Sequence, residues 1–88
     1  HQPTFSTVSL TAELLQRKYG GRKLSRRELE VAELVAIALS NRRIAETLNI
    51  QEQSVKNLVS AVMRKLGCRN RTSVALKLKE AVTDGLSQ

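Results

Sequence analysis

Apolar side chains recur along this chain at intervals of three and four residues, the spacing that places them on one side of an α-helix. They do not alternate with polar residues, as they would in a half-buried strand. Pro occurs once, at Pro3, and only four residues are Gly, so little interrupts this periodicity. The pattern predicts an all-α fold, and 88 residues allow one small domain.

Four helices are predicted from the apolar stripes and from the residues that begin and end helices. The first follows a capping box, in which the Ser25 hydroxyl and the Glu28 carboxylate each accept a backbone N–H. We expect Asn41 to cap the second helix and Asn49 to close it. Gly67 is expected to end the third helix, and Gly85 the fourth. The predicted ranges are 26–39, 42–48, 53–66 and 71–84.

The second and third of these helices, joined by a tight turn, predict a helix-turn-helix within a four-helix bundle. Residues 1–23 are predicted to be a flexible lead with a short linker helix over 9–19, and residues 24–88 to be the domain. The chain does not begin with Met, so we expect it to be a piece of a longer protein.

The positive charge is concentrated in one part of the chain. The formal net charge is +7, and the segment 53–79 holds seven basic residues and no acidic one. The rest of the chain is balanced, with eight basic and eight acidic residues. A localised surplus of this kind favours a polyanionic partner, although a solvated helix face would produce the same count.

Composition excludes several classes of protein. Aromatic residues are 2% of the chain, which argues against base stacking in single-strand and RNA readers. Cys68 is the single cysteine, so we expect no disulfide, no cysteine zinc site and a reducing compartment. No apolar run is long enough to span a membrane. We predict no enzyme, cofactor or metal site, because no catalytic set or phosphate-cradling loop is present.

The third predicted helix has an aliphatic side and a polar side without carboxylates. At 100° per residue, Val55, Val59 and Val62 fall on the aliphatic side. The polar side suits contact with DNA base edges, where Lys56 would donate to guanine and Asn57 would pair with adenine. The base-contacting candidates are Gln53, Lys56, Asn57 and Ser60.

Other basic and hydroxyl side chains are candidates for DNA phosphates, which set register rather than sequence preference. Arg42 and Arg43 open the second helix, where the helix dipole also favours an anion. The full set of phosphate-contacting candidates is Arg42, Arg43, Ser54, Arg64, Lys65, Arg69, Arg71 and Thr72. Glu28 is expected to be structural, serving the capping box and orienting a nearby Arg.

Four short motifs occur in order and cover about 55 residues. They are LSRRELEV at 24–31, SNRRIA at 40–45, SVKN at 54–57 and KLGCRNRT at 65–72. Together they resemble the LuxR-type helix-turn-helix domain. The resemblance implies a bundle whose third helix enters the major groove of double-stranded DNA, in a bacterial, cytoplasmic transcription factor.

The resemblance also implies a homodimer, formed through the last helix with Leu76, Lys77, Lys79 and Glu80 as contacts. Family members are often the output half of two-component response regulators, so an upstream receiver domain and contact with RNA polymerase are expected. The sequence departs from the family pattern at several positions, including Leu58 in place of His and Ser73 in place of an acidic residue. Gln51 stands where Ser or Thr usually caps the third helix, and Gly85 falls about one turn late, which predicts a longer last helix.

Two other functions would fit a basic helical domain. One is a sigma-factor-like module that contacts a promoter only within RNA polymerase, but such a module would lack the Asn70-Arg71-Thr72 corner. The other is a protein-interaction module that uses its last helix while the basic face only confers solubility. Binding to random and genomic DNA would separate these possibilities.

Overall fold

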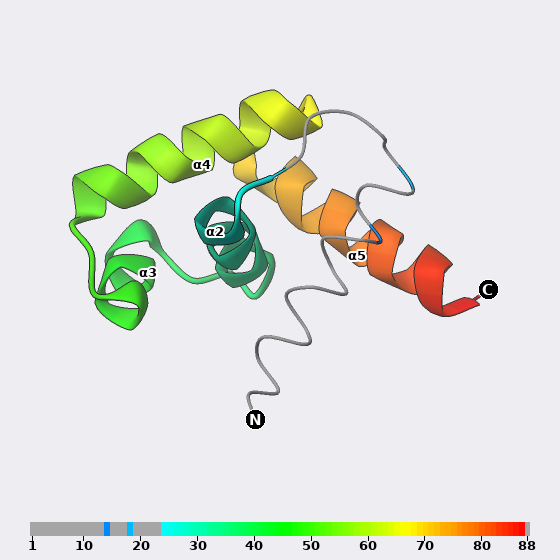
Figure 1. Cartoon of the computed structure of the whole chain (residues 1–88), viewed down its shortest axis with the longest axis horizontal. Helices are drawn as coiled ribbons and strands as arrows, with labels where there is room; N and C mark the ends of the chain where they lie inside the picture. The colour runs from blue at the N-terminus through cyan, green and yellow to red at the C-terminus, as the bar shows by residue number, and fades with distance from the viewer. Residues whose placement is uncertain (1–13, 15–17, 19–23, 88) are drawn as a thin grey trace.

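The computed structural model describes Leu14, Lys18 and residues 24–87, with side chains as far as Thr83. These ranges form four helices and no strand: α2 (Arg26–Ala36), α3 (Asn41–Leu48), α4 (Glu52–Leu66) and α5 (Arg71–Ser87). α2 lies in the middle of the view, with α4 above it, α3 to its left and α5 to its right (Figure 1). α2 packs against both α4 and α5, and α3 packs against α4. The predicted all-α four-helix architecture is confirmed.

The linker helix predicted over 9–19 lies mostly outside the described residues. Only Leu14 and Lys18 of that range are described, and both are helical. Leu14 is 5% exposed and belongs to the hydrophobic core.

The start of α2 is the capping box predicted from the sequence. The Ser25 backbone N–H donates to Glu28 Oε1 at 2.8 Å, and the Glu28 backbone N–H donates to Ser25 Oγ at 3.1 Å. Two N–H groups that α2 itself cannot satisfy are thereby paired.

The end of α2 comes earlier than predicted, at Ala36 rather than at residue 39. Ala38 adopts a left-handed conformation with φ of 67°. The Leu39 N–H then bonds to the Leu34 carbonyl at 3.2 Å, which folds the chain back over the helix end. Leu39 still packs against the core. The apolar periodicity therefore continues past the last helical residue, which is why the sequence pattern overestimated the helix.

The same closure ends two more helices. In each case an N–H donates to the carbonyl five residues earlier, and the residue before it has positive φ, as in a Schellman motif. The other two bonds are Ile50 to Ala45 at 3.0 Å and Cys68 to Met63 at 2.8 Å. The left-handed residues of the three closures are Ala38 at 67°, Asn49 at 57° and Gly67 at 69°. The expected roles of Asn49 and Gly67 are confirmed.

Two further predicted helix boundaries are wrong. Ser40, not Asn41, caps α3: its Oγ accepts the Arg43 N–H at 3.2 Å, and Asn41 is the first helical residue. Gly85 does not stop α5, which continues to Ser87. A single Gly costs a helix only about 1 kcal/mol, so it does not end one by itself. The start of α5 is capped by Asn70, whose Oδ1 accepts the Ser73 N–H at 2.9 Å.

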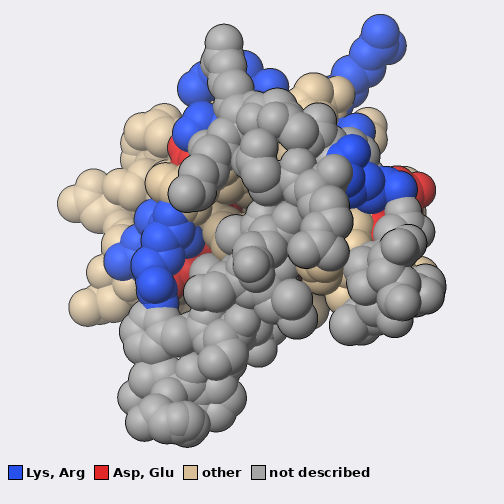
Figure 2. All heavy atoms as spheres, turned by 45° about the vertical axis from the view of Figure 1, so that its right-hand side comes forward, with Lys and Arg blue, Asp and Glu red and all other residues tan. Residues whose placement is uncertain are grey.

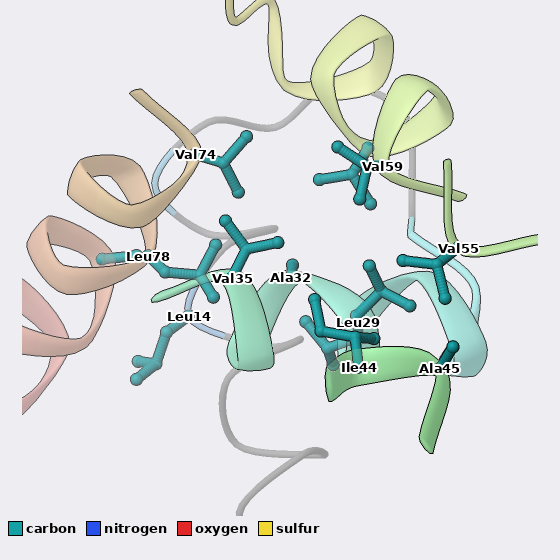
Figure 3. Packing of buried hydrophobic residues seen from close by; sticks show 13 residues of the cluster. Leu14, Leu29, Ala32, Val35, Ile44, Ala45, Val55, Val59, Val74 and Leu78 are labelled. Carbon is teal, nitrogen blue, oxygen red and sulfur yellow. The ribbon is translucent and has the colours of Figure 1, made fainter. Parts of the chain in front are cut away.

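The core is entirely aliphatic and draws on every described helix. Figure 3 shows Leu29, Ala32 and Val35 of α2 between the side chains of the other helices. Its buried members are Leu14, Leu29, Val31, Ala32, Val35, Ile44, Ala45, Val55, Val59, Val62, Val74, Leu78 and Ala81. Because α4 contributes three of them from one side, its opposite side is fixed toward solvent.

Candidate nucleic-acid interface

The position of α4 is set where it meets α3. α3 contacts α4, and Ile44 and Ala45 of α3 belong to the same buried cluster as Val55, one turn into α4 (Figure 3). The small Ala45 side chain allows close approach of the two helices, as expected for a helix-turn-helix. Gln51 occupies the N-cap position of α4 and makes no side-chain capping bond, which confirms that it is a poor cap.

The outer side of α4 carries the predicted base-contacting residues. Gln53, Lys56, Asn57 and Ser60 are all exposed, whereas Val55, Val59 and Val62 are buried. The Gln53 Nε2 group donates to Asn57 Oδ1 at 3.2 Å. That bond uses neither Gln53 Oε1 nor Asn57 Nδ2, so each amide keeps a group suited to a base edge. The arrangement presents two adjacent amides and one ammonium within two helical turns.

The predicted phosphate-contacting residues differ in their surroundings. Arg64, Arg69 and Thr72 are exposed, and Ser54 is half-buried at the start of α4. Arg42 and Arg43 are exposed and lie 3.6 and 3.7 Å from Glu46 carboxylate oxygens. Exposed pairs of this kind are weak and screened by salt, so these two arginines can exchange Glu46 for another anion.

Lys65 is engaged inside the protein. Its Nζ donates to Glu28 Oε1 at 2.8 Å, and both side chains are largely shielded from solvent. Glu28 was expected to orient an Arg, and its partner is this Lys instead. Burial raises the pKa of Glu28, but the hydrogen bond from Lys65, those from Ser25 and the Lys65 charge outweigh burial, so the pKa is lowered overall.

Arg71 is also engaged inside the protein. Its Nη2 donates to the Leu39 carbonyl oxygen at 2.8 Å, and its Nη1 donates to Asn41 Oδ1. Asn41 was assigned a capping role from the sequence, and this contact 30 residues away had no sequence signal. The phosphate role predicted for Arg71 and Lys65 rested on charge alone, and the structure gives each side chain an internal acceptor.

A hollow of about 290 Å³ lies between α4, the first residue of α3 and the corner before α5. It brings Lys56 and Ser60 of the base-contacting set together with Arg69 and Arg71 of the phosphate set. Its lining residues are Asn41, Lys56, Val59, Ser60, Met63, Arg69, Asn70 and Arg71. Residues far apart in sequence thus border one recess beside the outer side of α4.

The basic side chains do not coat the molecule evenly. On the face drawn in Figure 2, Lys and Arg form separate groups, and acidic side chains lie beside some of them. The α2 pair Arg26 and Arg27, for example, lies 3.9 and 3.0 Å from Glu30. By contrast, α4 beyond Glu52 has no acidic residue at all.

The residues predicted for dimerisation lie on a different side of the domain. Leu76 is 54% exposed, Lys79 and Glu80 are exposed, and Lys77 is half-buried. Leu76 and Lys79 line a groove of about 580 Å³ between α5 and the last turn of α2. The whole lining is Glu33, Ala36, Thr72, Ala75, Leu76, Leu78, Lys79, Val82 and Thr83.

Ile37, just beyond α2, is a large apolar residue that is 66% exposed, and the sequence pattern assigned it no role. Cys68 is half-buried and packs against the core, and burial raises the pKa of its thiol, while the Lys77 charge acts in the opposite direction. Across Leu14, Lys18 and 24–87 there is no group of three potential metal ligands. Within the same residues, no helix has the length and apolarity to cross a membrane.

Comparison with known proteins identifies one family. Residues 22–78 match the family described as bacterial regulatory proteins, luxR family. The chain is 48% identical over 59 residues to the two-component response regulator PprB of Pseudomonas aeruginosa, covering 67% of this chain and 22% of that protein. It is 43% identical over 54 residues to the transcriptional regulatory protein DegU of Brevibacillus brevis, covering 61% and 23%.

The match covers a larger share of a shorter relative. The spore germination protein GerE of Bacillus subtilis is 38% identical over 55 residues, which are 62% of this chain and 74% of that protein. The chain spans about a quarter of the length of PprB and of DegU. No solved structure gives a significant match.

Proposed function

Because the chain belongs to the LuxR family of bacterial regulatory proteins, which are DNA-binding transcription regulators, we propose that it binds double-stranded DNA with α4 in the major groove. The observation that carries the proposal is the outer side of α4, where every base-contacting candidate is exposed while the opposite side is buried in the core. α4 is about 22 Å long at 1.5 Å per residue, and the groove admits a helix.

Sequence preference would come from the first two turns of α4. Lys56 donates to guanine O6 or N7, and Asn57 or Gln53 forms a bidentate pair with adenine. Ser60, one turn further, contacts either kind of base. The Gln53–Asn57 hydrogen bond restrains both amides before DNA arrives, so less side-chain entropy is lost on binding.

Affinity would come mainly from phosphates. Exposed basic residues flank α4 on both sides, from the start of α3 to the corner before α5. The proposed set is Arg42, Arg43, Ser54, Arg64, Arg69 and Thr72, without Lys65 and Arg71, whose side chains have acceptors inside the protein. Each phosphate contact makes the affinity fall further as salt rises, because counterions are released on binding.

The proposed experiment separates base reading from phosphate binding. The wild-type chain first selects duplexes from a random-sequence pool, and the selected site and a scrambled duplex are then titrated. Lys56→Ala with Asn57→Ala should reduce the preference for the selected site at least about fivefold, because one bidentate contact discriminates by about 1–3 kcal/mol. Arg64→Ala, on the same helix, should weaken both duplexes alike. Equal site selection by the double variant and the wild type would refute the assignment.

We further propose that the protein acts as a homodimer formed through α5. Leu76 and Lys79 line the groove against α2, and Lys77 and Glu80 stand on the same helix. Two copies would place two α4 helices on half-sites that mirror the protein symmetry. Sedimentation of the chain with and without the selected duplex tests this, and Leu76→Glu should prevent the two-copy complex.

PprB is named as a two-component response regulator, and we propose the same arrangement for this chain. An upstream receiver domain would control dimerisation or access to α4 in the bacterial cytoplasm. Comparing the longer protein with the 88-residue chain on one operator tests this. Identical affinity and an identical response to phosphorylation would argue against it.

The groove between α2 and α5 favours a second candidate function, protein interaction. A half-exposed Leu beside a recess of about 580 Å³ would suit an apolar side chain of a partner such as RNA polymerase. If this were the main function, the wild-type chain would show no preference among random duplexes.

A further inference from the structure

Arg71, the first residue of α5, holds together two parts of the chain that are about 30 residues apart. Its guanidinium donates to the Leu39 carbonyl oxygen at 2.8 Å and to Asn41 Oδ1. Leu39 belongs to the connection between α2 and α3, and Asn41 begins α3. We propose that Arg71 is a positioning residue for DNA recognition, which fixes the start of α3 and so the orientation of α4. This inference rests on the proposed function.

The connection between α2 and α3 needs such a support. Ala38 is left-handed within it, and Ser40 caps α3 from it, so neither helix hydrogen-bonds the Leu39 carbonyl in its own ladder. An unpaired carbonyl at a half-buried position costs free energy, and the Arg71 Nη2 supplies its donor. The planar guanidinium fork reaches two acceptors at once, which a Lys ammonium on a flexible stem does not reproduce.

The two hydrogen bonds that Arg71 donates to Leu39 and Asn41, called the bridge below, also connect the elements at the two ends of α4. At one end, α3 contacts α4, and Ile44, Ala45 and Val55 belong to one buried cluster. At the other end, α4 closes at Gly67 and the chain turns into α5. Arg71 joins that second end back to the first residue of α3. α4 is therefore held between two fixed points rather than one.

The base-contacting candidates lie on α4 between these two fixed points. The hollow that the bridge borders is lined by Asn41 and Arg71 on one side and by Lys56 and Ser60 of α4 on the other. A change in the tilt of α3 relative to α5 would move those α4 side chains relative to the base edges. Loss of the bridge should thus reduce discrimination between sequences more than it reduces binding to DNA in general.

If Arg71 instead contacts a DNA phosphate, as its charge alone predicts, its substitution has a different effect on binding. Removing one phosphate contact reduces the magnitude of the negative slope of log affinity against log salt by about 0.9 and weakens all duplexes alike. A positioning residue changes the ratio of affinities between the selected site and a scrambled duplex and leaves that slope unchanged. Arg69, exposed two residues earlier, is the matched control for the phosphate role.

The test compares Arg71→Lys, Arg71→Gln and Arg69→Gln with the wild-type chain, at a temperature where circular dichroism shows all four fully folded. Both Arg71 variants should lower the ratio between selected and scrambled duplexes at least about fivefold, the discrimination of one bidentate contact, with an unchanged salt slope. Arg69→Gln should reduce the magnitude of the slope and keep the ratio. A reduced slope in Arg71→Gln that Arg71→Lys restores, or a lower melting temperature with an unchanged ratio, would overturn the inference.

A second measurement needs no DNA. The Ile44 N–H donates to the Ser40 carbonyl at 2.9 Å and the Arg43 N–H donates to Ser40 Oγ at 3.2 Å, so both amides report on the start of α3. Their hydrogen exchange should speed up at least tenfold in Arg71→Lys relative to amides of α4. If the wild-type chain lacks sequence preference but these amides respond, the proposed function fails while the bridge stands. If they do not respond, the bridge itself is refuted.

Discussion

Replacing Ala38 with Gly is expected to stabilise the domain, although it deletes a methyl group. Ala38 has φ of 67°, and its N–H donates to the Val35 carbonyl at 2.9 Å within the closure of α2. A residue with a Cβ is strained in this conformation because the Cβ crowds the following carbonyl oxygen. Ala38 is exposed, so its methyl group contributes little to the core.

The expected gain follows from two opposing effects. A left-handed residue other than Gly costs about 1–2 kcal/mol. Gly in turn costs about 0.4–1 kcal/mol because the unfolded chain gains conformational freedom. The net stabilisation should be about 0.5–1 kcal/mol, which for a domain of this size raises the melting temperature by about 2–8 °C.

The assay is urea and thermal unfolding followed by circular dichroism. Ala36→Gly is the matched control: Ala36 is also exposed but is the last residue of α2, so Gly there should destabilise by up to about 1 kcal/mol. Opposite signs for the two Gly substitutions support the reasoning. A destabilised Ala38→Gly protein would show that the left-handed conformation carries no strain at this position.

Three further outcomes are expected. Gly67→Ala should destabilise the domain by about 1 kcal/mol in urea unfolding. The cause is backbone strain at φ of 69° alone, because a Cβ at this position would meet no atom within 4 Å. A neutral effect would contradict this reasoning. Gln51→Ser should stabilise the domain by about 0.5–1 kcal/mol, because the backbone at residue 51 is extended and the Gln51 side chain makes no capping bond. The new hydroxyl would accept the N–H of Ser54, the third residue of α4, so failure of that amide to gain protection from hydrogen exchange would count against the prediction. The folded-state pKa of Glu28 lies below its ordinary value of 4.5, so Glu28 contributes stability that is present above pH 4.5 and is lost as the pH falls through the folded pKa. Glu28→Gln should remove that part of the acid dependence in unfolding titrations from pH 7 to 3, and an identical acid profile would disprove the contribution.

The sequence predicted the helices because the interactions that define them are local. The Ser25–Glu28 capping box spans three residues, and the aliphatic side of α4 repeats at helical spacing. The boundaries were harder, since Ser40 and Asn41 are both good caps and nothing local selects between them. Ala38 gave no signal because Ala is the best helix former, yet here it ends a helix.

Long-range partners could not be predicted in the same way. The positive charge of Lys65 and Arg71 is visible in the sequence, but the acceptors Glu28 and Leu39 lie more than 30 residues away. Charge alone therefore assigned both side chains to DNA. The exposed residues of α4 were predictable because helical periodicity fixes both sides of a helix once one side is buried.

Leu14 belongs to the core of the folded domain, although it lies outside the residues that match the family. The family match begins at residue 22, whereas this leucine, eight positions earlier, is buried beside Val35 and Leu78 (Figure 3). A fragment trimmed to the family limits would leave its place vacant, and losing a buried Leu side chain costs small domains about 2–5 kcal/mol. The buried Leu14 side chain thus joins a residue outside the family match to the hydrophobic core of the domain.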